Sequence, residues 1–167
     1  RPLPVTFVQD RVFYDGEDIT LAIRSSEGSR NASLISAIGP VRDALLSFQR
    51  DSARLPGLVA DGRDMGTVVF PQAVLKVFLT ASAEKRAERR YKQLISQGLP
   101  ANITTLREEL ETRDARDASR SVAPLRPADD ALMLDNSDMD IDTATLQVLS
   151  WWAQKHPGFQ RANASDS

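Results

Sequence analysis

Two short charged segments of this sequence contain residue types that could do chemistry. Asp61-Gly62-Arg63-Asp64 follows an apolar run at 58–60, where a buried strand would end, and open α/β sheets bind ligands at such positions. Further along, Arg113, Asp117 and Arg120 recur at i, i+4 and i+7, which is one face of a helix. Arginine offers a planar fork of donors to a phosphate, and a carboxylate accepts from an amino group. These residues together fit a ligand with an anionic end and a polar end, such as a nucleoside monophosphate.

Both segments also have a purely structural interpretation. Arg63 and Asp64 could form an internal ion pair that stabilises the loop, and the helix could be a solvated face with i, i+4 ion pairs. Such a face would place Arg116 over Arg120, and a like-charged pair of this kind costs about 0.2–0.5 kcal/mol. An anion bound between the two arginines would remove the repulsion. The pair therefore favours the functional interpretation.

A third basic cluster lies on the helix predicted before these residues. It consists of Arg86, Arg89 and Arg90. Lys85 and Glu88 show that this helix is generally charged, so a solvated surface is the stronger interpretation for it.

The composition excludes several classes of protein. The 167 residues are 41% hydrophobic and 26% charged, which is typical of one globular domain, with or without a small appendage. A net charge of −2 gives no field for nucleic acid, and Trp151 and Trp152 have no basic stripe beside them. The chain has no cysteine and one histidine, so a disulfide or a zinc site is not expected. No apolar run is long enough to cross a membrane, and we expect a cytoplasmic location.

Apolar runs predict strands, and periodicity near 3.6 residues predicts helices. The predicted strands are 58–60, 74–79 and 131–135, and the predicted helices after residue 80 are 83–97, 105–118 and 141–154. This alternation is typical of an α/β chain with a parallel sheet. A hairpin at 4–14 and a helical segment at 29–49 precede it, and a flexible tail is expected at 155–167.

One glycine pattern has the spacing of a phosphate-binding loop but not its chemistry. Gly57 and Gly62 are separated by four residues, yet Arg63 and Asp64 follow where lysine and serine or threonine are required. The four residues between the glycines are predicted as a strand and not as an amide-lined cradle. No other Gly-x-x-x-x-Gly-Lys-[Ser/Thr] motif occurs in the sequence.

The sequence resembles the bacterial cytidylate kinases over roughly residues 3–154. The resemblance rests on a long block, Leu55–Pro71, and on the shorter stretches 16–19, 41–46, 113–117 and 122–125. It implies an α/β fold of the P-loop-kinase type, a parallel sheet flanked by helices with a monophosphate-binding insertion and a helical lid. By this resemblance residues 1–54 would bind CMP, residues 55–154 would form the core, and the lid would span about 83–120.

The resemblance also implies an activity and a set of site residues. Such kinases transfer the γ-phosphoryl group of ATP, with Mg²⁺, to CMP or dCMP. By position, Ser33, Arg42 and Asp64 would read the cytosine, Arg63, Arg113 and Arg120 would hold the phosphate, and Asp117 would hold the sugar hydroxyls. Arg116, with Arg113 and Arg63, would neutralise the transferring group, with Arg86 and Arg90 as further lid candidates. We expect a monomer, with no metal ligands among these side chains and no nucleic-acid or membrane partner.

The sequence departs from the family pattern in one respect. The family begins with a strand, a phosphate loop and helices that would precede the region matching Leu3, and we expect the N-terminal strand, loop and helix to be missing here. The alternative to a kinase is then a chain that binds CMP but, without the ATP phosphate loop, does not turn it over.

Overall fold

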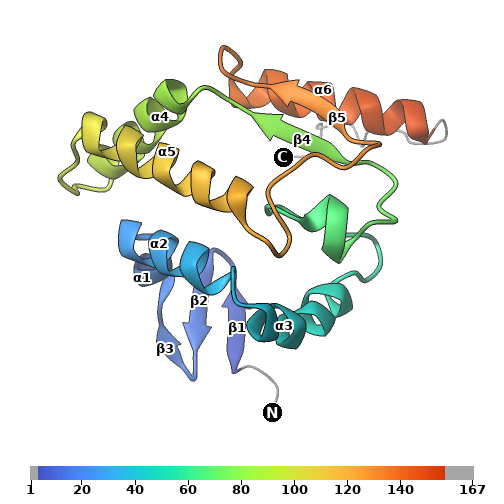
Figure 1. The fold of residues 1–167 in the computed structure, drawn as a ribbon, viewed down its shortest axis with the longest axis horizontal. Helices are drawn as coiled ribbons and strands as arrows, with labels where there is room; N and C mark the ends of the chain where they lie inside the picture. Colours follow the sequence, from blue (N-terminus) through green and yellow to red (C-terminus); the bar gives the residue numbers. More distant parts are fainter. Residues whose placement is uncertain (1–3, 157–167) are drawn as a thin grey trace, which may run out of the picture. The chain divides into compact units, whose positions relative to one another are not determined.

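The computed structural model describes residues 4–156, which belong to two compact units (Figure 1). The first unit is Arg1–Phe48 and the second is Gln49–Ser167. The predicted tail at 155–167 lies outside the described residues from residue 157 on, and Lys155 is still helical. Among the helices of the described part of the chain, none is long and apolar enough to cross a membrane.

The first unit begins with an antiparallel sheet in the order β1-β2-β3. β1 (Val5–Val8) pairs with β2 (Arg11–Tyr14), which confirms the predicted hairpin. β3 (Glu17–Asp18) follows a turn at Asp15 and Gly16. Both turn residues have a positive φ, 50° and 84°, as a type I′ hairpin turn requires. Glycine adopts this conformation without steric cost.

Three helices follow this sheet. They are α1 (Thr20–Arg24), α2 (Ser26–Ile35) and α3 (Gly39–Asp51). Ser25 separates the first two helices, and its side chain accepts a hydrogen bond from the backbone N–H of Gly28 at 3.0 Å. The helical segment thus begins earlier than the predicted 29–49, because a serine cap initiates α2 where the hydrophobic periodicity is weak.

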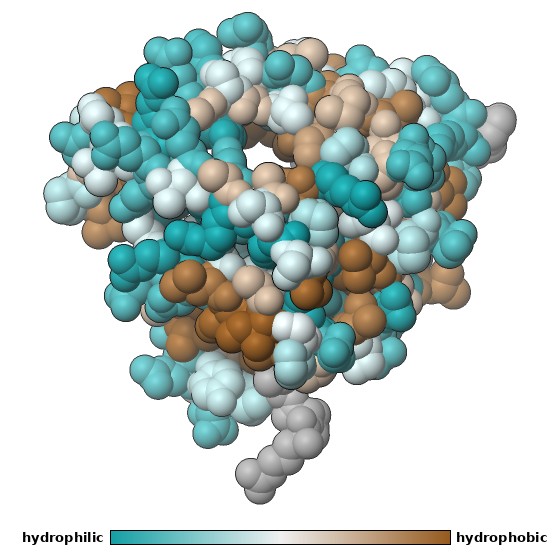
Figure 2. Space-filling view, in the orientation of Figure 1, coloured by the Kyte–Doolittle hydropathy of each residue, from teal (hydrophilic) through white to brown (hydrophobic). Residues whose placement is uncertain are grey.

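The first unit leaves much of its hydrophobic surface uncovered, as Figure 2 shows over this part of the chain. Its large exposed side chains include Phe7, Leu21, Leu34 and Ile38. Ser33 is the one residue of its described part that is fully buried. The unit therefore owes its shape more to hairpin and helix hydrogen bonds than to a core.

The second unit has a sheet of two parallel strands. β4 (Val77–Thr80) lies beside β5 (Leu132–Asp135) in register. Parallel strands need a crossover connection, and here the crossover contains α4 (Ala83–Ser96) and α5 (Ile103–Ser119). α6 (Ile141–Lys155) follows β5. The predicted α/β class with parallel strands and helices is confirmed.

The helices of this unit begin at side-chain caps. The side chains of Ser82 and Asp140 accept from backbone N–H groups in the first turns of α4 and α6. For α5 the cap is Asn102, whose side chain accepts from the N–H of Thr105 at 3.1 Å. The helix therefore begins at Ile103, two residues before the predicted start at Thr105.

α4 and α5 pack against each other around a small hydrophobic cluster. Its buried members are Ala87 and Leu94 on α4 and Leu106 on α5. An ion pair between Arg86 and Asp114, with an N···O distance of 2.5 Å, joins the same two helices. The two helices consequently form one hairpin-like element.

The predicted buried strand at 58–60 is wrong. The backbone there is irregular, Leu58 is 45% exposed and Val59 is fully exposed. A strand needs a hydrogen-bonded neighbour, and among residues 4–156 β4 and β5 pair only with each other. The predicted strands 74–79 and 131–135 do exist, with the shorter bounds given above.

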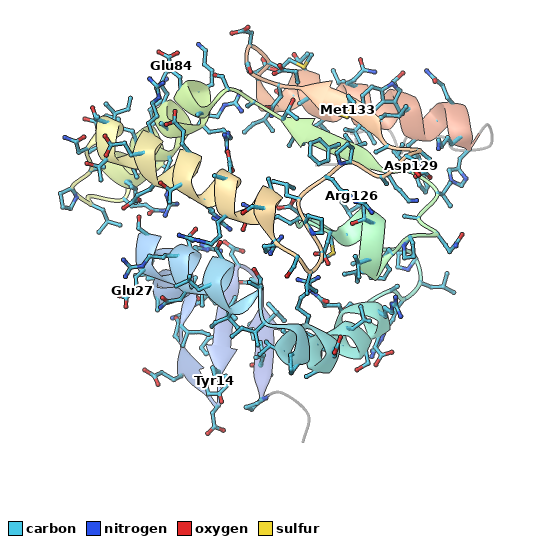
Figure 3. All side chains as sticks on the ribbon, viewed as in Figure 1. Tyr14, Glu27, Glu84, Arg126, Asp129 and Met133 are labelled. Carbon is cyan, nitrogen blue, oxygen red and sulfur yellow. The ribbon has the colours of Figure 1, made fainter. Side chains whose placement is uncertain are left out.

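β5 provides a test of the second unit's packing. Leu134 is 4% exposed, whereas its neighbour Met133, labelled in Figure 3, is 56% exposed. We expect Leu134→Ala to lower the free energy of unfolding of this unit by about 2–5 kcal/mol, because it leaves a cavity. Met133→Ala should have a much smaller effect. Denaturant titration followed by the fluorescence of Trp151 and Trp152, both on α6, measures the difference, and equal effects would contradict the assigned burial.

The first unit contains a carboxyl group with a shifted pKa. Hydrogen bonds from Thr20 and Arg11 lower the pKa of Asp18 from its ordinary value of 3.8 to about 2. Since the folded-state pKa is the lower one, these bonds stabilise the fold fully above about pH 4, and their contribution is lost as the pH falls towards 2. An NMR titration of the Asp18 carboxyl carbon should show this midpoint. Thr20→Val should move it back towards 3.8, and an unshifted midpoint in the unsubstituted chain would refute the assignment.

Candidate functional site

The segment after Arg63 is a π-helix, η1 (Met65–Val69), for which Asp64 is the N-terminal cap residue. The backbone carbonyl of Asp64 accepts from the N–H groups of Val68 and Val69 at 2.8 and 3.2 Å. Asp64 as a whole is 5% exposed. Short π-helices are rare and are frequent at functional sites, so the local backbone itself marks this segment.

The centre of the charged cluster is Asp117 on α5. Its side chain is 2% exposed, and its Oδ2 accepts from Nε of Arg63 at 3.1 Å. Nε of Arg113, one helical turn earlier, lies 3.7 Å from the same oxygen. Burial lowers the pKa of Arg113, and so does the positive charge of Arg63, while Asp117 opposes the shift. A guanidinium remains charged in a protein, so the three groups together carry one net positive charge.

Arg120 lies at the end of α5 beside Asp117. The helix ends at Ser119, and Nε of Arg120 donates to the backbone carbonyl of Asp117 at 3.3 Å. The N–H of Leu125 donates to the same carbonyl at 2.8 Å, so the loop after α5 folds back onto the helix end. The predicted helical stacking of Arg116 over Arg120 is wrong for this reason, because Arg120 has left the helical conformation.

The lid candidates have local partners. Arg86 donates to Asp114 and, through Nε, to the carbonyl of Ala81 at 3.1 Å. Arg90 donates to the side chain of Gln93 at 2.8 Å. Arg86 thus ties α4 to α5, whereas the bond from Arg90 to Gln93 lies within α4.

Ser33 and Arg42 belong to the first unit. Arg42 donates to the backbone carbonyl of Ser36 at 3.2 Å, and the hydroxyl of Ser36 donates to the carbonyl of Ser33 at 2.9 Å. The two predicted residues are therefore linked through Ser36, which sequence reasoning did not identify. Their predicted role in reading a base stays a prediction.

Sequence reasoning also missed Arg50. It is the last basic residue of α3 and belongs to the second unit, and its guanidinium donates to two carbonyls of η1. No motif surrounds it, because a contact with backbone carbonyls leaves no pattern in side-chain types. A contact of this kind can be found only once the fold is known.

Residues 4–156 contain neither a cluster of metal-ligating side chains nor a Gly-x-x-x-x-Gly-Lys-[Ser/Thr] loop. In residues 4–156 no group of three or more acidic or histidine side chains converges as a metal site. The sequence contains no Gly-x-x-x-x-Gly-Lys-[Ser/Thr] cradle either.

An α/β chain that gathers arginines around a buried carboxylate at one helix end has the site expected of a protein that handles phosphate-bearing ligands. The family model for cytidylate kinase matches residues 1–154. The chain therefore belongs to the cytidylate kinase family, whose members are phosphotransferases.

Curated relatives agree with this assignment. The cytidylate kinase of Cupriavidus pinatubonensis is 61% identical over 151 residues, which are 90% of this chain and 68% of that protein. That of Cupriavidus necator is 59% identical, over 93% of this chain and 70% of the relative. The cytidylate kinase of Ralstonia pickettii is 56% identical, over 98% of this chain and 70% of the relative. The chain spans a little over two thirds of the length of these three relatives.

The buried cluster can be tested by removing its negative charge. Asp117→Asn keeps the shape but leaves Arg63 and Arg113 without their counter-charge, and we expect it to lower the free energy of unfolding by about 1–3 kcal/mol. Glu111→Gln is the matched control, since it breaks an exposed pair with Arg107 on the same helix and should change little. Chemical denaturation compares the two variants. A loss no larger for Asp117→Asn than for Glu111→Gln would show that the cluster does not depend on the charge.

Proposed function

We propose that this chain provides the acceptor side of a cytidylate kinase, which transfers the γ-phosphoryl group of ATP to CMP or dCMP and yields CDP or dCDP. The observation that carries the proposal is the pair of guanidinium groups, Arg63 and Arg113, held by the buried Asp117. These two guanidinium groups and the Asp117 carboxylate together carry a net positive charge, which attracts an anion. Family membership supplies the identity of that anion, the 5′-phosphate of the nucleotide.

Within this proposal, the arginines of the cluster share the phosphate. Arg63, Arg113 and Arg120 hold it in the ground state, and Arg116, with Arg113 and Arg63, neutralises charge on the transferring group. The Asp117 carboxylate is covered and accepts from Arg63, so a contact with the sugar hydroxyls requires that guanidinium to shift towards the nucleotide. Ser33 and Arg42 are proposed base contacts from residues 1–54, and the lid is proposed at about 83–120.

Asp64 is proposed to select the base. Cytosine presents an exocyclic amino group, which can donate to a carboxylate, whereas uracil presents a carbonyl at the same position. Asp64 is buried, so a carbonyl facing it would add repulsion without a hydrogen bond. A buried carboxylate thereby favours CMP and dCMP over UMP. ATP and Mg²⁺ as co-substrates, a monomeric state and a cytoplasmic location complete the proposal.

The alternative function is a chain that binds CMP without turnover. In P-loop kinases a Gly-Lys-[Ser/Thr] loop holds the donor phosphates, and residues 1–167 do not contain this motif. A coupled assay with ATP, Mg²⁺ and CMP separates the two, since steady formation of CDP supports the kinase, and binding without CDP supports the alternative function.

Base selection is tested by calorimetry with CMP and UMP. We expect the unsubstituted chain to prefer CMP by about 100-fold or more, because the carbonyl of uracil would repel the buried carboxylate where the amino group of cytosine donates to it. Asp64→Asn should reduce CMP affinity by about 10- to 100-fold. Asp61→Asn, an exposed neighbour in the same loop, is the control and should bind as the unsubstituted chain does. Equal affinities for CMP and UMP would sink the proposed role of Asp64.

A further inference from the structure

The guanidinium of Arg50 donates to two adjacent carbonyls at the end of the π-helix. Its Nε donates to the carbonyl of Val69 at 3.0 Å, and its terminal nitrogen donates to the carbonyl of Val68 at 3.1 Å. The last carbonyls of a helix have no partners within the helix, and a guanidinium presents several N–H groups in one plane. Arg50 therefore caps the C-terminal end of η1 with two hydrogen bonds from one rigid group.

Val68 and Val69 also bind the residue that precedes the π-helix. The N–H groups of Val68 and Val69 donate to the backbone carbonyl of Asp64, at 2.8 and 3.2 Å. Each of these valines thus faces Asp64 with its N–H and Arg50 with its carbonyl. Val69 is also 2% exposed, so its side chain is fixed in the packed interior. Arg50 consequently fixes the residues on which the backbone of Asp64 rests.

We propose that Arg50 is a positioning residue for the Arg63-Asp64 segment. By fixing the carbonyls of Val68 and Val69, it keeps η1 wound and so determines where the Asp64 carboxylate and the Arg63 guanidinium lie. Arg50 does not itself touch the nucleotide in this proposal. The consequence for base selection rests on the proposed function, whereas the effect on the backbone of η1 does not.

The competing role is a contact that only stabilises the fold. Arg50 would then join α3 to η1, and its loss would lower the melting temperature without changing which base is preferred. A positioning role differs in two respects. If Arg50 positions η1, its loss makes the amides of η1 exchange faster in the absence of ligand. Its loss also lowers the ratio of CMP to UMP affinity.

Two variants and a control distinguish these roles. Arg50→Gln removes both contacts, and Arg50→Lys keeps one positive donor without the planar fork. Arg54→Gln is the matched control, because Arg54 is a neighbouring arginine that donates to the carbonyl of Asp51 at 3.1 Å and not to η1. The full chain is used for all three, with melting temperatures measured first.

Hydrogen exchange and calorimetry give the readouts. In Arg50→Gln we expect exchange at the amides of Val68 and Val69 to rise about tenfold, with a fall of about tenfold in the ratio of CMP to UMP affinity. Arg50→Lys should lie between this variant and the unsubstituted chain. Arg54→Gln should match the unsubstituted chain in both measurements. If Arg50→Gln does not fold, faster exchange of these amides and a lower ratio of CMP to UMP affinity in Arg50→Lys than in the unsubstituted chain carry the same support.

The outcomes distinguish the effect of Arg50 on the backbone of η1 from its effect on base selection. A lower melting temperature with unchanged exchange in η1 and an unchanged affinity ratio overturns the positioning role. Faster exchange without a change in the ratio overturns it as well, because the base-reading residue has then kept its place. If the unsubstituted chain shows no preference for CMP, the proposed function fails, and unchanged or faster exchange still decides whether Arg50 holds the π-helix.

Discussion

The charged cluster of the second unit depends on one interaction, the buried carboxylate of Asp117 with the guanidinium of Arg63. A carboxylate removed from water is stable only when positive groups and donors replace its hydration. The chain supplies them from a loop 54 residues earlier and from the preceding turn of α5. The Asp117 carboxylate thereby holds the loop that contains Arg63 against the C-terminal part of α5. Arg63 and Arg113 both lie against this one carboxylate, so the three groups together carry a net positive charge that attracts an anion.

This constraint continues along the backbone on either side. Next to Arg63, the carbonyl of Asp64 accepts hydrogen bonds from the π-helix. At Asp117, the backbone carbonyl accepts from the N–H of Leu125, which brings the following loop back to the end of α5. A Cβ at position 62 would come within 2.9 Å of the Met65 side chain, so a larger residue than Gly62 would require that side chain to shift.

Local signals in the sequence predicted the elements that depend on local chemistry. The predicted helix starts at 83 and 141 agree with the structure, where Ser82 and Asp140 are the caps. The residue types at Arg63 and Asp117 indicate a charged cluster. The strand at 58–60 was wrong because an apolar run does not reveal whether a neighbouring strand exists. The stacking of Arg116 on Arg120 was wrong because helical spacing does not show where the helix ends. Arg50 was missed because backbone acceptors leave no trace in side-chain patterns.

The exposed run after α3 affects how the protein behaves at high concentration. Leu55 is 97% exposed and Val59 fully exposed, on an irregular backbone without a partner strand among residues 4–156. Exposed apolar segments without a partner strand can associate with another molecule, which leads to self-association and precipitation. Arg54 and Asp61 flank the run and oppose such contacts by keeping charge at its ends.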